Sequence, residues 1–369
     1  GTIGLAAIKA QGGLVIVQDP AEAGYDGMPR SAMLTGLVDM VLPVARMPEA
    51  LLAHTRRVPR PPARAPLAGT RVEARLPDII ALLRARTPHD FTQYKDGTLS
   101  RRVERRMAIV QHGGGDVEAY VKLLADKDDE ADQLARDLLI HVTSFFRDPK
   151  VFALLESEIV PEMVRCQPVD QPLRIWIAGC STGEEAYSLA MLFREAVIAD
   201  GREVRLQIFA SDIDPDSVAA ARYGQYPATI EADISPQRLA RWFTRESDGY
   251  RVVPELRAAV VFTVHDVLTD APFSRIHFVS CRNLLIYLRP EAQAHVISLF
   301  YFALRAGGLL LLGTAETITG DSSRFEDQAK AERIFRHTGG SRTAELPFGR
   351  GDAVRPASRS EPGPVRSRQ

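Results

Sequence analysis

Short apolar runs that alternate with helical segments constrain the second half of this chain more than any other feature. The runs occupy residues 173–178, 206–210, 260–264, 277–280 and 309–313. Strands of a parallel sheet that is buried on both faces have this continuous apolar character, and the segments between them are long enough for crossover helices. The alternation therefore predicts an α/β fold, with a mostly parallel sheet covered by helices.

A glycine turn follows the first apolar run. Residues 179–183 read Gly-Cys-Ser-Thr-Gly, and a helical segment with Glu184 and Glu185 comes next. Glycines let a ligand approach the backbone, and the free amides of a helix start can bind an anionic group. The second run ends at Asp212, at the distance expected of a carboxylate that binds ribose hydroxyls. These features predict a nucleoside-containing cofactor; a plain strand-to-helix turn with a capping aspartate is the alternative.

The same turn also matches the G-x-S-x-G elbow that presents a nucleophilic serine in esterases, and residues 112–115, His-Gly-Gly-Gly, are similar to their oxyanion loop. In an esterase that loop follows a strand. Residues 99–111 instead have the pattern of an arginine-rich amphipathic helix, which the glycines would end. A serine esterase that uses Ser181 is therefore the second-ranked hypothesis.

Composition changes along the chain predict its division into domains. Residues 1–54 contain one predicted strand and two short helices, which are too few to bury one another. Residues 55–75, rich in Pro and Arg, predict a semi-rigid linker, and the helical periodicity of residues 76–165 predicts a small all-α domain. The α/β domain then covers residues 166–337. Residues 338–369 are rich in Gly, Pro, Ser and Arg, which predicts a disordered tail.

The charge balance and the cysteines limit the possible partners. There are 46 Lys and Arg against 47 Asp and Glu, which gives no overall attraction to nucleic acid. No apolar run approaches the roughly 20 residues that span a bilayer, and no export signal follows Gly1. Three scattered cysteines suit a reducing compartment. We expect a soluble cytoplasmic protein, cut from a larger polypeptide, with no metal, no nucleic-acid partner and no membrane insertion.

Two further segments are candidates for binding. The predicted helix at residues 99–110 gathers four arginines opposite its apolar stripe, where they could dock an acidic surface or form a solvated face: Arg101, Arg102, Arg105 and Arg106. Residues 141–148, His-Val-Thr-Ser-Phe-Phe-Arg-Asp, place polar side chains around an aromatic pair just before the α/β domain. They could cover a cofactor cleft or form a packed hinge.

Four ordered motifs give the chain a family resemblance. They are HVTSFFRD at 141–148, IAGCSTGEEAYSLA at 177–190, FASDID at 209–214 and SCRNLLIYL at 280–288. Residues 77–336 resemble the chemotaxis-receptor glutamate O-methyltransferases of the CheR type. The resemblance implies an all-α domain followed by a class I S-adenosylmethionine-dependent methyltransferase sheet of Rossmann-like form, with a small antiparallel β subdomain at residues 234–253.

The resemblance also implies a reaction and its partners. S-adenosyl-L-methionine would methylate glutamate carboxylates on chemoreceptor-type proteins and leave S-adenosyl-L-homocysteine. The arginine-rich helix would meet the acidic methylation helices of the receptor. The hairpin turn at residues 246–249 looks short for binding a receptor-tail peptide. A catalytically silent cofactor-binding module is a third hypothesis.

The family's functional positions map onto this sequence residue by residue. Arg147 and Tyr287 would border the methyl-transfer pocket, and Arg147 could hold the substrate carboxylate. His141 and Asp266 stand where the family has asparagine. The cofactor-binding positions would be His141, Thr143, Arg147, Gly179, Glu185, Asp212, Asp266, Val267, Arg282 and Asn283.

Residues 1–54 resemble the end of a chemotaxis methylesterase domain of the CheB type. That family's catalytic Ser, His and Asp would precede the stretch, so these residues should have no esterase activity of their own. The two resemblances together imply a covalent fusion of methylesterase and methyltransferase regions in a sensory adaptation protein. The same fusion could include signalling domains.

Overall fold

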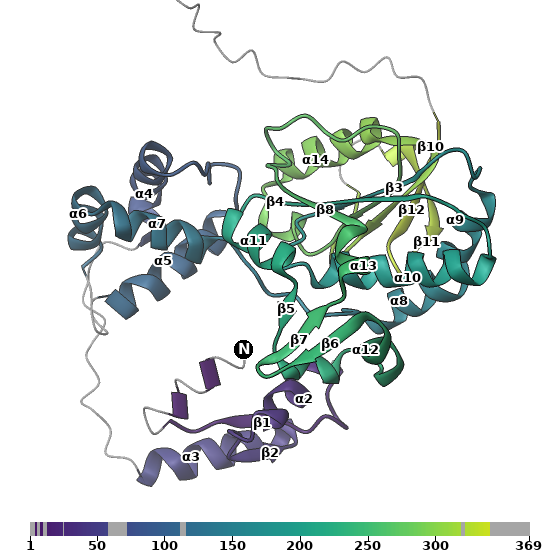
Figure 1. The fold of residues 1–369 in the computed structure, drawn as a ribbon. Helices are drawn as coiled ribbons and strands as arrows, with labels where there is room; N and C mark the ends of the chain where they lie inside the picture. The colour runs from purple at the N-terminus through teal and green to yellow at the C-terminus, as the bar shows by residue number, and fades with distance from the viewer. Residues whose placement is uncertain are drawn as a thin grey trace, which may run out of the picture. The chain divides into compact units, whose positions relative to one another are not determined.

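The computed structural model describes residues 4–5, 8–9, 13–24, 26–57, 72–110, 116–318 and 322–339 (Figure 1). Most of the expected linker, the glycine segment at residues 112–115 and nearly all of the expected tail lie outside the described residues. Among the described residues, no helix is long and apolar enough to cross a membrane.

All five apolar runs form strands of one seven-stranded sheet, in the order β11-β12-β10-β9-β3-β4-β8. The five from β8 to β10 are parallel, and β12 and β11 extend the sheet in antiparallel pairing. The predicted α/β class is confirmed, although the last two strands were not foreseen. The bounds are β3 Leu173–Ala178, β4 Leu206–Asp212, β8 Val260–Val264, β9 Ile276–Cys281, β10 Leu304–Leu312, β11 Phe325–Ala329 and β12 Ile334–His337.

Successive side chains of a strand point to opposite faces of the sheet. Both faces of this sheet are buried. Ile175 and Ile177 of β3 join one hydrophobic cluster, and Trp176 and Ala178 join the other. The helices that accompany the sheet are α8 Pro149–Leu154, α9 Val160–Cys166, α10 Glu184–Asp200, α11 Pro215–Tyr223, α13 Pro254–Ala258 and α14 Pro290–Ala303, with η2 Leu155–Ile159 between α8 and α9.

The predicted helical region is confirmed as all-α. Its helices are α4 Val72–Arg86, α5 Asp96–Val110, α6 Val117–Asp126 and α7 Asp128–Leu138. The expected end of this domain at residue 165 needs correction. Phe152, Leu155 and Val160 are buried in the same cluster as Ile175 of the sheet, so residues 149–166 pack with the α/β domain.

The first part of the chain contains one more strand than expected. The elements are β1 Ile16–Gln18, α2 Gly27–Leu34, β2 Met40–Leu42, η1 Val44–Arg46 and α3 Met47–Arg57. β2 pairs with β1 in parallel, with Ile16 opposite Met40, where we expected an amphipathic helix through Leu37 and Leu42. Three apolar residues are too short a run to separate strand from helix by periodicity.

The antiparallel subdomain is present but starts before its expected first residue, 234. Its sheet has the order β5-β7-β6, formed by β5 Gln225–Tyr226, β6 Phe243–Glu246 and β7 Gly249–Val252, with η3 Ala228–Ala232 and α12 Pro236–Trp242 between β5 and β6. Glu246 pairs with Gly249 across the predicted short hairpin turn. The expected start at residue 234 leaves out β5, which is only two residues long.

We predict that Gly249→Ala destabilises this subdomain by about 3 kcal/mol, because it adds backbone strain and overpacking. Gly249 has a φ of 142°, and an added Cβ would lie 2.1 Å from the Tyr226 carbonyl oxygen. Urea unfolding followed by circular dichroism measures the loss.

Gly307→Ala is the matched control. Gly307 has a φ of 74°, and no described residue lies within 4 Å of an added Cβ, so only a strain of about 1 kcal/mol is expected. Equal losses in the two variants would contradict the steric explanation.

Candidate active site

The candidate site lies at the carboxyl end of β3, where the strand order changes direction. β4 and β8 lie on one side of β3, and β9 and β10 lie on the other. At such a point the two crossover connections leave in opposite directions and open a crevice for ligands. The glycine turn follows β3 directly, so it lies at this crevice.

The glycine turn bends around the end of β4. The N–H of Gly179 donates to the Ser211 carbonyl oxygen at 2.8 Å, and the N–H of Ser181 donates to Asp212 Oδ2 at 2.7 Å. Gly183 has a φ of 97°, and an added Cβ would lie 2.9 Å from the Ala221 Cβ, so glycine is required there. The turn thus holds Asp212 at the strand end.

Asp212 keeps the capacity to bind hydroxyl groups. Its Oδ1 accepts from the Asp214 N–H at 3.1 Å, while Oδ2 accepts from Ser181. Each carboxylate oxygen can accept a second hydrogen bond, which suits a ribose diol. Burial raises the pKa of Asp212, and the backbone N–H groups of Asp214 and Ser181 oppose this shift.

A small pocket beside Asp212 combines acidic and apolar side chains. Gly179, Asp212, Asp266 and Val267, predicted from separate parts of the sequence, all line it. Acidic groups for hydroxyls combine here with an apolar surface for a base. The remaining lining residues are Tyr94, Ser211, Ile213, His265, Leu268, Leu284 and Leu288.

The Asp266 carboxylate is partly used by its own turn. Oδ1 accepts from the Leu268 N–H at 2.8 Å, and Oδ2 accepts from Thr269 Oγ1 at 3.1 Å. These bonds fix the chain on either side of Val267, which is buried. Asp266 therefore shapes the pocket wall whether or not it contacts a ligand.

A buried arginine organises the next part of the site. Arg282, which follows β9, donates to Glu185 Oε2 at 3.0 Å, to Asp148 Oδ2 at 2.6 Å and to the Arg147 carbonyl oxygen at 2.8 Å. Glu185 Oε1 also accepts from Ser280 Oγ at 2.6 Å. The Arg282 side chain has no exposed area, so it orients Glu185 and residues 147–148. Its Nε is buried without a partner among the described residues.

Segment 141–148 borders the same crevice. His141 lies with Nε2 3.3 Å from Asp214 Oδ2 and Nδ1 3.1 Å from Ser217 Oγ. Thr143 is half-buried, and the Arg147 guanidinium donates to the Val142 carbonyl oxygen at 2.8 Å. The segment is therefore attached to both α11 and the strand ends.

His141 also lies near Ser181, and the distance between the two side chains bears on the esterase alternative. The Ser181 Oγ is 3.4 Å from His141 Nδ1, longer than an ordinary O–H···N hydrogen bond. Ser217 Oγ is closer to the same nitrogen and donates to Asp214 Oδ2 at 2.7 Å. The imidazole is thus shared within a network that includes Ser217, and the site gives the esterase hypothesis no better support than the methyltransferase hypothesis.

Glu316 is a site residue that sequence reasoning missed. Its Oε2 accepts from the N–H of Gly313 at 2.7 Å and of Asn283 at 3.0 Å, and Oε1 accepts from Ile286 at 3.2 Å. These bonds hold the loop from Asn283, with a φ of 60°, to Tyr287 in η4, Leu285–Tyr287. An acidic residue just after the apolar run at 309–313 was the available signal. Burial raises the pKa of Glu316, despite its backbone donors.

The four arginines of α5 do not form one free surface. Arg101 and Arg105 are exposed, whereas Arg106 donates to Glu130 Oε1 at 2.9 Å and Oε2 at 2.8 Å. Arg102 is half-buried and donates to the Asp137 carbonyl oxygen. Packing against α7 therefore occupies two of the four predicted substrate-binding side chains.

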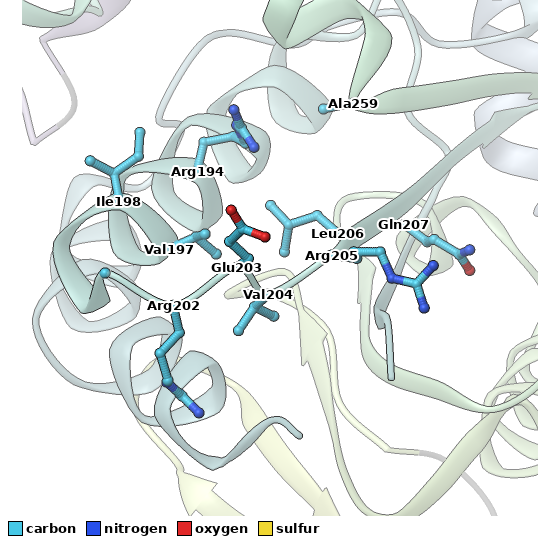
Figure 2. A pocket seen from close by; sticks show the side chains of 11 residues that line it. Arg194, Val197, Ile198, Arg202, Glu203, Val204, Arg205, Leu206, Gln207 and Ala259 are labelled. Atoms are coloured by element: carbon cyan, nitrogen blue, oxygen red, sulfur yellow. The ribbon is translucent and has the colours of Figure 1, made fainter. Parts of the chain in front are cut away.

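A second hollow lies at the opposite end of β4 and contains none of the predicted site residues. Figure 2 shows Arg194, Glu203 and Arg205 around it, and Leu206, the first residue of β4, is in its wall. Asp212 is the last residue of the same strand. The pocket beside Asp212 and this hollow are therefore separate. No group of three or more potential metal ligands occurs in the part of the chain that the structure describes.

The sheet order and the site define the class of protein. A glycine turn after β3, a ribose-type carboxylate after β4 and a pocket wall after β8 are the features of a class I S-adenosylmethionine-dependent methyltransferase. The carboxylate of Glu185 at the start of α10 and that of Asp212 at the end of β4 fit a cofactor that carries an ammonium group and ribose hydroxyls.

The chain belongs to the CheR methyltransferase family, and its cofactor is S-adenosylmethionine. Residues 141–334, more than half of the chain, match the family described as CheR methyltransferase, SAM binding domain. Residues 75–139 match the CheR methyltransferase all-alpha domain, and residues 1–51 match CheB methylesterase.

Named relatives agree with this assignment. The chain is 31% identical to the chemotaxis protein methyltransferase of Listeria innocua, over 62% of this chain and 84% of that protein. It is 33% identical to chemotaxis protein methyltransferase 1 of Pseudomonas aeruginosa, over 50% and 69% respectively. An uncharacterised 104.1 kDa protein of Rhodobacter capsulatus is 39% identical over 91% of this chain, which spans only 37% of that protein.

We predict that Glu316→Gln destabilises the protein by about 1–3 kcal/mol, because an amide NH₂ would replace one oxygen that faces backbone donors. Loosening the Asn283 loop should also weaken binding of S-adenosylhomocysteine. Thermal unfolding and isothermal titration calorimetry measure the two effects.

Glu326→Gln is the control, because Glu326 is an exposed residue of β11. It should change neither quantity. If Glu316→Gln behaved like this control, Glu316 would have no positioning role.

Proposed function

We propose that this chain methylates glutamate side-chain carboxylates of chemoreceptor-type proteins, with S-adenosylmethionine as the methyl donor. The observation that supports this most is the tie between segment 141–148 and the crevice through Arg282 and Asp148. Arg282 donates both to the Arg147 carbonyl oxygen and to Glu185 Oε2, which supports a shared role for Arg147 and Glu185 near the methionine part of the cofactor. The names of the relatives support the receptor as substrate.

Methyl transfer to a carboxylate requires little acid–base catalysis by the protein. When bound, the cofactor supplies an electrophilic methyl group on a sulfonium. A glutamate side chain with a pKa of about 4.3 is already ionised at neutral pH, so no general base is needed. Catalysis then depends on alignment of the carboxylate and on exclusion of water.

Arg147 is proposed to align the substrate carboxylate. One guanidinium nitrogen donates to the Val142 carbonyl oxygen, so the guanidinium retains donors for a carboxylate. A paired arginine–carboxylate contact fixes orientation as well as position. Tyr287 is proposed to line the same methyl-transfer pocket, held there by the Glu316-bound loop.

The cofactor contacts are proposed on the same basis. His141, Thr143, Arg147 and Glu185 would surround the methionine part, and Asp212 would hold the ribose. Asp266 and Val267 would border the base. Arg282 would act mainly through Glu185, since its own side chain is buried.

The receptor contact is proposed for the exposed side of α5. Arg101 and Arg105 are exposed and can meet an acidic helix, with only the Arg101 Nε donating to the Gly97 carbonyl oxygen, while Arg106 is neutralised by Glu130. Residues 1–51, which match CheB methylesterase, suggest that methylesterase-like and methyltransferase regions act within one adaptation protein in the cytoplasm. Domain limits near 54, 75, 140 and 337 are part of this proposal.

We predict that Arg147→Ala lowers the rate of receptor methylation by roughly 100-fold, because the carboxylate loses its orientation. The measurement is transfer of labelled methyl from S-adenosylmethionine to an acidic helical receptor segment, scored as base-labile ester. Arg165→Ala, an exposed arginine on α9, should keep the original rate.

Two results would count against the proposal. If no base-labile methyl formed with the unmodified chain, the glutamate methyltransferase function would be wrong. If Arg147→Ala matched Arg165→Ala, only the role of Arg147 would be wrong.

We also predict that Arg101→Ala/Arg105→Ala raises the KM for an acidic receptor helix several-fold and leaves kcat nearly unchanged, because these exposed charges assist docking. The KM of the original chain should rise with salt, and that of the double variant should rise less. Arg106→Gln should instead lower the unfolding temperature, since it leaves Glu130 without its cation. An unchanged KM in the double variant would refute the docking role.

A further inference from the structure

Tyr94 is a pocket residue that comes from outside the methyltransferase sheet. It lies between α4 and α5 in the helical region, yet it lines the pocket together with Asp212 and Asp266. Its side chain belongs to the buried core, with 9% exposed area. None of the family motifs in the sequence includes this position.

Backbone pairing holds Tyr94 at the pocket. Tyr94 forms an antiparallel bridge with Leu288, the Lys95 N–H donates to the Tyr287 carbonyl oxygen at 2.9 Å, and the Arg289 N–H donates to the Gln93 carbonyl oxygen at 2.9 Å.

Side chains strengthen the same junction. Arg289 Nε donates to the Tyr94 carbonyl oxygen at 3.0 Å, and Lys95 Nζ donates to the Ile286 carbonyl oxygen at 2.8 Å. The Ile286 N–H in turn donates a hydrogen bond to Glu316. The position of Tyr94 therefore depends on the same loop that carries Tyr287.

The phenol of Tyr94 suits a nucleoside ligand. Phe91 packs edge-on against the ring, with centroids 5.4 Å apart. Burial raises the pKa of Tyr94, and the carboxylates of Asp266 and Asp212 raise it further, so the hydroxyl keeps its proton at neutral pH. No described residue accepts a hydrogen bond from this hydroxyl, so the donor is available to a ligand in the pocket.

We propose that Tyr94 is a cofactor-binding residue: its ring closes the adenosine pocket, and its hydroxyl donates a hydrogen bond to the nucleoside. The helical region then contributes directly to cofactor affinity, in addition to any contact with the receptor. The inference relies on S-adenosylmethionine as cofactor and is independent of which substrate is methylated.

The test is binding of S-adenosylhomocysteine to the full chain, measured by isothermal titration calorimetry without receptor. Tyr94→Ala should weaken binding by at least about tenfold, since it removes ring and hydroxyl together. Tyr94→Phe keeps the packing and should weaken binding about fivefold. The ligand-induced rise in unfolding temperature should shrink in the same order.

Tyr120→Phe is the matched control. Its hydroxyl donates to Glu130 at 2.8 Å within the helical region, away from the pocket, so the change should lower stability and leave the affinity unchanged. If both Tyr94 variants bound S-adenosylhomocysteine as tightly as the original chain, the proposal would be overturned. Loss of affinity in Tyr94→Ala alone would support the ring contact and overturn the hydrogen bond.

Because the readout is binding, failure of receptor methylation would leave this result unaffected. Conversely, normal methylation of a receptor combined with unchanged affinity in both Tyr94 variants would refute the Tyr94 proposal and leave the proposed function standing.

Discussion

The buried guanidinium of Arg282 is the interaction on which the rest of the site depends. It joins the end of β9 to Glu185 at the start of α10 and to Asp148 in segment 141–148. A buried cation is stable only with partners, and removal of one partner of such a pair typically costs about 3–5 kcal/mol. This one buried cation fixes three chain segments that are distant in sequence at their positions around the crevice.

Glu316 is a second buried charged group of the site, and backbone hydrogen bonds stabilise it. Among the described residues its carboxylate has no cationic partner, and the backbone N–H groups of Gly313, Asn283 and Ile286 hold it. The loop that leads to Tyr287 is thereby fixed, and the pairing of Leu288 with Tyr94 extends this order into the helical region. One buried acid thus links the proposed methyl-transfer pocket to the proposed nucleoside pocket.

Sequence reasoning succeeded where the determinant is local. Apolar runs located five strands of the sheet, and the glycine turn with Asp212 located the crevice, because both patterns reflect the geometry of a single strand–helix unit. It missed β2 and β5 because two or three residues show no period. It missed Tyr94 and Glu316 because their positions follow from pairings between segments far apart in the chain, which residue spacing does not encode.

The arginines of α5 and the serine of the glycine turn show a further limit of motifs. Spacing put four arginines on one side of a helix, but Glu130 on another helix decides that Arg106 is internal. The pattern G-x-S-x-G suited two enzyme classes, and the difference lies in the partners of Ser181: its N–H fixes Asp212, while its hydroxyl is only one of two serine hydroxyls near His141. A motif restricts which groups are present, and the tertiary contacts of each group determine what chemistry it can perform.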